Sequence, residues 1–119
     1  MLQGIDIRPE YLRTLKTLLR RHAPKAEVWA YGSRVSDGGH DSSDLDIVLR
    51  SPDDLDRPQE NLLTLKEILS ESELPIIIDV LDWARVPEAF QREISKDYVI
   101  IQSPEAEDSL KQLPETLMS

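Results

Sequence analysis

Apolar residues recur along this chain with two different periods, which predicts a mixture of helices and strands. Helical spacing extends from Arg8 to Ala23 and again from Glu60 to about Ser72. Pro24 ends the first of these segments, and Pro75 separates the second from the apolar run that follows it. The apolar positions are Leu12, Leu15, Leu18 and Leu19 in the first helix and Leu62, Leu63, Leu65, Ile68 and Leu69 in the second.

Extended segments are predicted where apolar residues alternate with polar ones or form short unbroken runs. The segment Ile76–Leu81 is apolar apart from Asp79, which predicts a strand buried on both faces. A short helix that begins at Pro87 precedes the last extended segment, Tyr98–Ile101. Helices and strands in this order place the chain in the α/β class. The predicted strands are Glu27–Tyr31, Asp44–Arg50, Ile76–Leu81 and Tyr98–Ile101.

The stretch from Gly32 to Ile47 carries the candidate chemistry. Side chains alternate along a strand, so Asp44 and Asp46 point to one face at a separation of roughly 7 Å. Paired carboxylates suit a hard divalent cation such as Mg²⁺, which binds oxygen and leaves room for substrate phosphates. Gly32 allows the backbone to approach a phosphate, and Ser33 offers its hydroxyl and its N–H. The spacing indicates a metal–nucleotide site, although a Gly-Ser turn before an Asp-rich loop is as typical of a solvated connection.

Asp79 is a further candidate ligand, because a carboxylate among aliphatic residues is costly to bury without a partner. A metal ion shared with Asp44 and Asp46 would be such a partner. The alternative is that Asp79 lies at a strand edge and bonds to the backbone or to an arginine such as Arg50.

Two common ion and phosphate motifs are excluded. An EF-hand loop that starts at Asp37 would have Ser42 instead of glycine at its sixth position and Val48 instead of glutamate at its twelfth. A Walker-type phosphate loop needs Gly-Lys followed by Ser or Thr, which this chain lacks.

Composition limits the classes of protein that the chain can represent. Its 119 residues indicate one small domain. A formal net charge of −9 argues against binding a nucleic-acid backbone. The absence of cysteine excludes disulfides and thiolate metal sites. No apolar run approaches the roughly 20 residues of a membrane span, and the first residues lack a signal pattern, so no membrane role is expected and the cytoplasm is the expected location.

The pattern Gly32-Ser33, ten residues, then Asp44-Leu45-Asp46 resembles the signature of the polymerase-beta-type nucleotidyltransferases. In particular, it resembles the minimal nucleotidyltransferases that are usually found beside a HEPN-domain partner. The resemblance extends over most of the chain, from roughly Ala26 to Gln102.

The loop departs from the family motif, which often reads Gly-Ser-Arg-Ala-Arg-Gly. The chain keeps Arg34 but has Ser36 and Asp37 where the second arginine and the glycine would be. Gly38 and Gly39 could supply the turn one residue late.

The resemblance implies a nucleotidyltransferase fold, with a small mixed β-sheet of three to four strands and helices packed on one side. It implies that Asp44, Asp46 and Asp79 bind two Mg²⁺ ions, with Mn²⁺ as an alternative, and that Asp79 takes the proton of the acceptor hydroxyl. The triphosphate of ATP would then be held by Gly32, Ser33 and Arg34.

The resemblance further implies an antitoxin that transfers AMP from ATP to a hydroxyl, expected to be a tyrosine, of a HEPN-type ribonuclease toxin and so neutralises it. Two other interpretations stay open. One is a non-catalytic binding module of the same fold that neutralises its partner by contact alone. The other is a sensor that binds ATP and Mg²⁺ and transfers nothing.

Residues 1–103 are predicted to form the minimal nucleotidyltransferase domain, and residues 104–119 to form an acidic C-terminal tail. The tail contains Glu105, Glu107, Asp108 and Glu115, interrupted by prolines.

Overall fold

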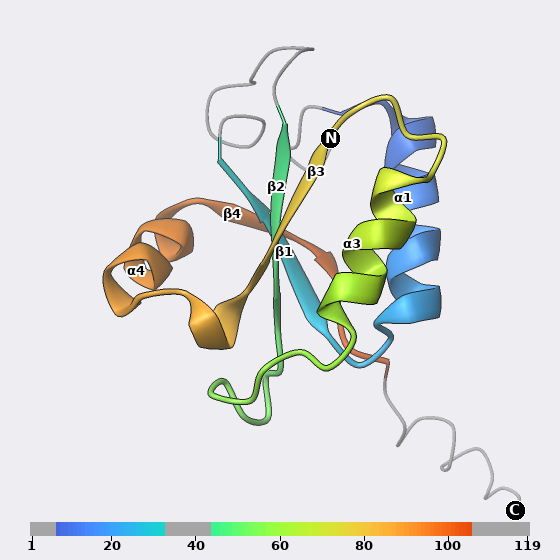
Figure 1. Cartoon of the computed structure of the whole chain (residues 1–119). Coiled ribbons are helices and arrows are strands. Elements are labelled where there is room, and N and C mark those ends of the chain that lie inside the picture. The colour runs from blue at the N-terminus through green and yellow to red at the C-terminus, as the bar shows by residue number, and fades with distance from the viewer. Residues whose placement is uncertain (1–6, 33–43, 106–119) are drawn as a thin grey trace, which may run out of the picture.

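A computed structural model of the chain describes residues 7–32 and 44–105. These residues form a mixed four-stranded sheet with helices on both of its faces (Figure 1). The α-helices are α1 (Pro9–His22), α3 (Leu62–Ser70) and α4 (Glu88–Lys96), and a short 3-10 helix, η1, spans Trp83–Arg85. The strands are β1 (Glu27–Tyr31), β2 (Leu45–Arg50), β3 (Ile78–Asp82) and β4 (Tyr98–Gln102).

The strand order in the sheet is β3-β2-β1-β4. β1 runs antiparallel to both β2 and β4, whereas β2 and β3 are parallel. A parallel pair needs a crossover connection, and α3 supplies it between β2 and β3. β3 and β4 are therefore the edge strands of this sheet. The expected mixed sheet of three to four strands is confirmed, and the predicted element bounds agree with the observed ones to within two residues.

One face of the sheet packs against α1 and α3, and this contact forms the larger core. The predicted apolar faces of these helices supply Leu12, Leu15, Leu19, Leu65 and Leu69 to it. The strands supply every second residue, as the period of a half-buried strand requires. The strand residues of this core are Val28, Ala30, Leu45, Ile47, Leu49, Val80 and Ile101.

The opposite face packs against α4 and η1. Ile94 of α4 and Trp83 of η1 are buried together with Trp29, Tyr31 and Val48 of the sheet. Figure 1 shows α4 on the side away from α1 and α3. The expectation of helices on one side holds for α1 and α3, whereas α4, the helix predicted after Pro87, lies on the other face. The reason is that α4 is short and amphipathic, so its sequence shows an apolar stripe but not which face of the sheet the stripe covers.

Arg50 is held within this second face. Its guanidinium carbon lies 4.2 Å from the ring centroid of Trp29 and 4.7 Å from that of Trp83. Its Nε lies 3.1 Å from a carboxylate oxygen of Glu27, the residue opposite it in the β1–β2 register. Arg50 therefore stabilises the aromatic cluster by cation–π and ionic contacts. The alternative in which Arg50 pairs with Asp79 is wrong.

Within the two described ranges, no helix has the length and apolar character needed to cross a membrane.

Candidate active site

Tyr31, Asp46 and Asp79 lie in one row across three neighbouring strands. Asp46 of β2 is the register partner of Tyr31 in β1 and of Asp79 in β3. Register partners project from the same face of a sheet, and neighbouring strands are about 4.8 Å apart. The structure thus brings together two carboxylates that are 33 positions apart in the sequence, on the face that also carries α4.

Gly32 follows the end of β1 and lies against Asp46. Its φ is 90°, in the left-handed region that favours glycine. A Cβ atom at this position would lie 2.5 Å from Oδ2 of Asp46, closer than two such atoms can approach. The backbone of Gly32 therefore lies close against the carboxylate of Asp46, and its predicted approach to a phosphate stays a prediction.

Negative charge is concentrated around Asp46. Partial burial raises the pKa of Asp46, and the charges of Asp79 and then Asp44 raise it further. Burial, followed by the charges of Asp46 and Asp79, also raises the pKa of the Tyr31 phenol above its ordinary value of 10.0, so this hydroxyl stays protonated at neutral pH. Asp44 immediately precedes β2 and is exposed. The charges of the other two predicted carboxylates therefore act on Asp46.

The prediction that the strand around Asp79 is buried on both faces is wrong. β3 is an edge strand, Asp79 is exposed, and Ile77 just before the strand is 68% exposed. An apolar run does not reveal whether a strand has one neighbouring strand or two. The run around Asp79 therefore predicted more burial than an edge strand has. The inference that Asp79 needs a partner because it is buried does not hold. Its place in register with Asp46 depends on strand pairing instead.

Other parts of the predicted site are not covered by the described residues. Ser33 and Arg34, the other two predicted phosphate ligands, lie outside them, as do Ser36, Asp37 and the glycines of the loop. Within the part of the chain that the structure describes, no three His, Asp or Glu side chains are arranged to hold a metal ion together. The metal-ligand roles of Asp44, Asp46 and Asp79 therefore stay a prediction.

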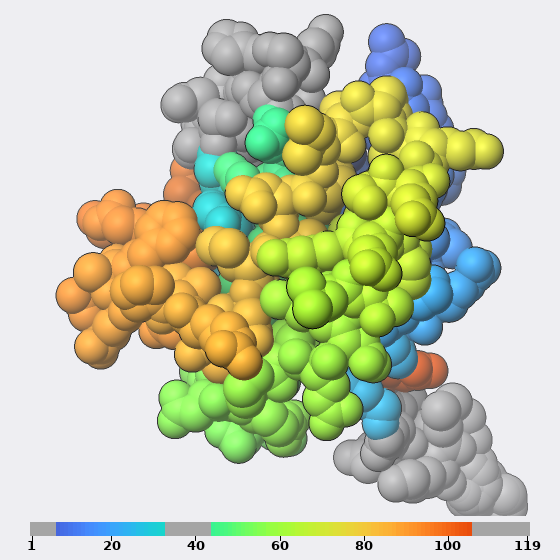
Figure 2. Space-filling view, in the orientation of Figure 1, coloured from blue at the N-terminus to red at the C-terminus, as the bar shows by residue number. Residues whose placement is uncertain are grey.

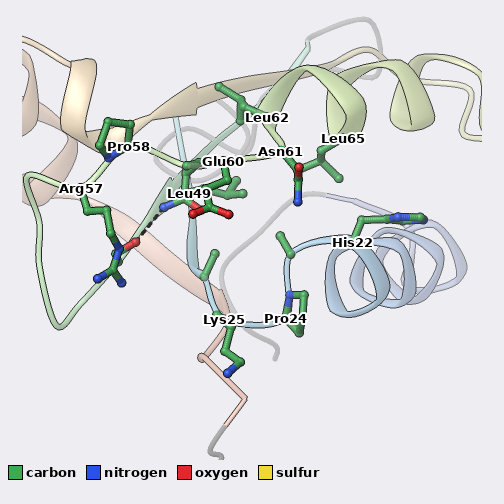
Figure 3. Close-up of a pocket in the computed structure, with 14 residues that line it drawn as sticks. His22, Pro24, Lys25, Leu49, Arg57, Pro58, Glu60, Asn61, Leu62 and Leu65 are labelled. Atoms are coloured by element: carbon green, nitrogen blue, oxygen red, sulfur yellow. Dashed lines mark hydrogen bonds between the residues drawn. The ribbon is translucent and has the colours of Figure 1, made fainter.

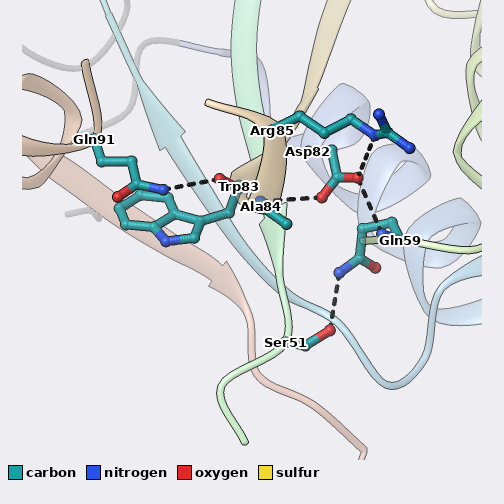
Figure 4. Close-up of polar contacts among 7 residues, drawn as sticks. All are labelled: Ser51, Gln59, Asp82, Trp83, Ala84, Arg85 and Gln91. Carbon is teal, nitrogen blue, oxygen red and sulfur yellow. Dashed lines mark hydrogen bonds and ion pairs between the residues drawn. The ribbon is translucent and has the colours of Figure 1, made fainter. Parts of the chain in front are cut away.

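Two residues of this region were not predicted from the sequence. Tyr31 was predicted only as the last residue of a strand; it is buried, and it also stands beside Asp46 in the row. Asp82 is 4% exposed, and its carboxylate accepts hydrogen bonds from the backbone N–H groups of Gln59 at 3.0 Å and Ala84 at 3.2 Å (Figure 4). Asp82 thus anchors the C-terminal end of the strand that carries Asp79. Its only sequence signal is a polar residue ending an apolar run.

A cavity of about 410 Å³ lies at the other end of the sheet from these carboxylates. It opens between the end of α1 and the start of α3, with His22 and Pro24 on one side and Asn61 and Leu65 on the other (Figure 3). Its strand lining comes from Leu49, near the end of β2, whereas Asp46 is near the beginning. The cavity is therefore separate from the candidate active site.

The small mixed sheet with helices on both faces places this chain in the α/β class. The model of the nucleotidyltransferase domain family matches residues 12–103, and the chain belongs to this family. A relative from Haemophilus influenzae, named a probable protein adenylyltransferase MntA, is 44% identical over 101 residues, which are 85% of this chain and 87% of the relative.

Solved structures share this fold. A chain from a crystal structure of a toxin-antitoxin with AMP-PNP superposes with a TM-score of 0.62 at 20% identity, over 90% of this chain and 85% of that one. A chain from a structure of a tri-AMPylated Shewanella oneidensis HEPN toxin in complex with an MNT antitoxin has a TM-score of 0.59 at 17% identity, over 94% and 86% of the two chains. At these identities the likeness shows the fold alone.

Proposed function

We propose that this protein is an Mg²⁺-dependent adenylyltransferase that transfers AMP from ATP to a tyrosine hydroxyl of a HEPN-domain toxin, and so acts as its antitoxin. The observation that carries the proposal is the register pairing of Asp46 with Asp79, beside the backbone of Gly32. The relative named a probable protein adenylyltransferase supports the reaction type. The structural neighbours described as toxin–antitoxin complexes support the kind of partner.

The carboxylates fit a hard divalent cation. Burial, and then the charges of Asp79 and Asp44, raise the pKa of Asp46, and a cation would relieve the repulsion among these carboxylates. Asp44, Asp46 and Asp79 would hold two Mg²⁺ ions or, as an alternative, Mn²⁺. When bound, the metal ions neutralise charge on the phosphates and on the attacking oxygen.

The residues of the chain perform the other parts of the reaction. The acceptor oxygen attacks the α-phosphorus of ATP, the bond from this phosphorus to the bridging oxygen breaks, and pyrophosphate leaves. Asp79 accepts the proton of the attacking hydroxyl, because it is exposed at the sheet edge where an acceptor can approach. Gly32 and, by their place in the sequence, Ser33 and Arg34 bind the triphosphate.

The proposal also covers the organisation of the chain. Residues 1–103 form the catalytic domain and residues 104–119 an acidic tail outside it. The acceptor hydroxyl comes from a second protein, which the structural neighbours described as toxin–antitoxin complexes support. ATP as the substrate agrees with a cytoplasmic location.

The test is transfer of label from α-labelled ATP to a co-expressed HEPN partner in the presence of Mg²⁺. Asp46→Asn should lower the rate at least about 100-fold, since a lost charge interaction of roughly 3 kcal/mol in the transition state has this effect. Asp56→Asn is the matched control, because Asp56 is exposed in the loop beyond β2, at the other end of that strand from Asp46. A tight complex in which the partner gains no label would favour the non-catalytic module instead.

A further inference from the structure

Large apolar side chains stay exposed beside the carboxylate row, on the side of β4 and α4. Phe90 of α4 is 41% exposed, and Tyr98 and Ile100 of β4 are 37% and 47% exposed. Tyr98 is the register partner of Tyr31, and Ile100 that of Trp29, so both project from the face that carries Asp46. Figure 2 shows the cyan end of β1 at the surface between the orange α4 and the yellow start of β3.

The two exposed aromatic rings lie on the β4 and α4 side of the carboxylates, with Tyr31 in between. The row across the sheet runs Tyr98, Tyr31, Asp46, Asp79, one residue from each strand. Two strand spacings of about 4.8 Å separate the backbones of Tyr98 and Asp46. The ring of Phe90 meets that of Tyr31 edge-on, with the centroids 6.0 Å apart. A ribose and a base can bridge this interval when the α-phosphate lies at Asp46.

The ring of Tyr98 is already held in place. It stacks on Trp29 with the centroids 3.8 Å apart and the planes 11° from parallel. Trp29 in turn contacts Trp83 edge-on at 5.2 Å. One face of the Tyr98 ring is therefore covered, and the exposed area belongs to the rest of the ring. A ligand that packs against a ring held in this way loses little of its binding free energy to ordering the side chain.

On the other sides of the carboxylates the described residues offer no exposed aromatic ring; the large apolar side chain exposed there is Ile77, at 68%. Beyond Asp79 the sheet ends, because β3 is an edge strand. The reverse face of the sheet is covered by α1 and α3. Phe90 and Tyr98 are thus the exposed aromatic residues that adjoin the row on its open face.

We propose that Phe90 and Tyr98 form the platform on which the base of the nucleoside triphosphate packs, with Tyr31 between them and the carboxylates. This inference rests on the proposed function, since it assumes that the α-phosphate lies at Asp46 and Asp79. Packing against aromatic rings recognises the area of a base and not its hydrogen-bonding edge. The platform therefore favours purine over pyrimidine triphosphates and discriminates weakly between ATP and GTP.

The test is the affinity of the full chain for the non-hydrolysable analogue AMP-PNP with Mg²⁺, measured by calorimetry. Phe90→Leu keeps an apolar side chain and removes the ring, and should raise the Kd roughly tenfold. Tyr98→Leu should do the same, whereas Phe90→Tyr and Tyr98→Phe should bind as the wild type does. Leu63→Ala is the matched control, because Leu63 is exposed on α3, the helix that covers the reverse face. Thermal melting confirms that each variant is folded. If Tyr98→Leu does not fold, the result for Phe90→Leu decides the test.

The outcomes separate this inference from the proposed function. If the wild type binds AMP-PNP with Mg²⁺ and Asp46→Asn weakens binding, but folded Phe90→Leu binds as tightly as the wild type, the platform is wrong and the proposed function stands. If Phe90→Leu weakens only the complex with the partner protein, the rings serve the partner, and the platform is again wrong. If the wild type does not bind the nucleotide, alone or with its partner, both proposals fail.

Discussion

Gly32 and Asp46 are so close that any side chain at position 32 would collide with the carboxylate at position 46. A Cβ atom on Gly32 would lie 2.5 Å from Oδ2 of Asp46, and the φ of 90° at Gly32 is unfavourable for any residue with a side chain. The end of β1 and the start of β2 therefore depend on each other, and the backbone of the predicted phosphate turn lies directly against a predicted metal ligand.

Gly32→Ala should lower both stability and activity. The backbone conformation alone costs about 1–3 kcal/mol for a residue with a Cβ, and the contact with Asp46 adds to this. Chemical denaturation measures the loss of stability. In a double-mutant cycle with Asp46→Ala, the collision disappears, so the second substitution should recover part of the loss. Purely additive effects would show that the contact with Asp46 contributes nothing.

Asp46 should make the metal-free protein less stable at neutral pH. Its pKa is raised above the ordinary value of 3.8, so the stabilisation from its proton is present below that value and is lost as the pH rises through the raised pKa. In cation-free buffer Asp46→Asn should therefore be more stable than the wild type at pH 7. The difference should shrink as the pH falls through the raised pKa towards about 4, below which Asp46 is neutral in both the folded and the unfolded chain. Denaturation curves over this pH range measure it, and a difference that does not vary with pH would contradict the electrostatic cause.

Added Mg²⁺ should stabilise the wild type, because it relieves the repulsion around Asp46 and binds only the folded chain. A gain of about 1 kcal/mol raises the Tm by roughly 4 °C in a domain of this size. Asp44→Asn should reduce the gain, whereas Asp56→Asn should leave it unchanged. A Tm that does not respond to millimolar Mg²⁺, with or without ATP, would argue against a metal site at these carboxylates.

Asp82 should be important for folding and not for nucleotide contacts. Its buried carboxylate accepts two backbone hydrogen bonds and lies 3.5 Å from Nε of Arg85. Asp82→Ala would leave the two N–H groups without their acceptor, at a cost of about 2–4 kcal/mol.

The matched control for Asp82 is Asp54→Ala. Asp54 accepts a similar bond from the backbone N–H of Asp56, but in an exposed loop, so its loss should cost less than about 1 kcal/mol. Equal losses of stability in the two variants would show that burial does not increase the value of the Asp82 bonds. Unfolding in urea measures both.

Local features of the fold could be predicted well. β1 was predicted with the bounds that the structure shows, and the leucine faces of α1 and α3 point into the core as expected, apart from the exposed Leu63. The candidate site was predicted in part. Asp46 and Asp79 are in register and Gly32 adjoins Asp46, whereas Ser33 and Arg34 lie outside the described residues.

The sequence by itself determined which residues are helical or extended and which carboxylates alternate with apolar neighbours, because these periods depend only on residues a few positions apart. Only the tertiary structure decided that Asp79 is in register with Asp46, that β3 is an edge strand and that α4 brings Phe90 to the same face as Tyr31. Strand order, register and the face that a helix covers arise from pairing between segments far apart in the chain, where many arrangements satisfy the same local pattern. The packing of the whole domain selects one of them.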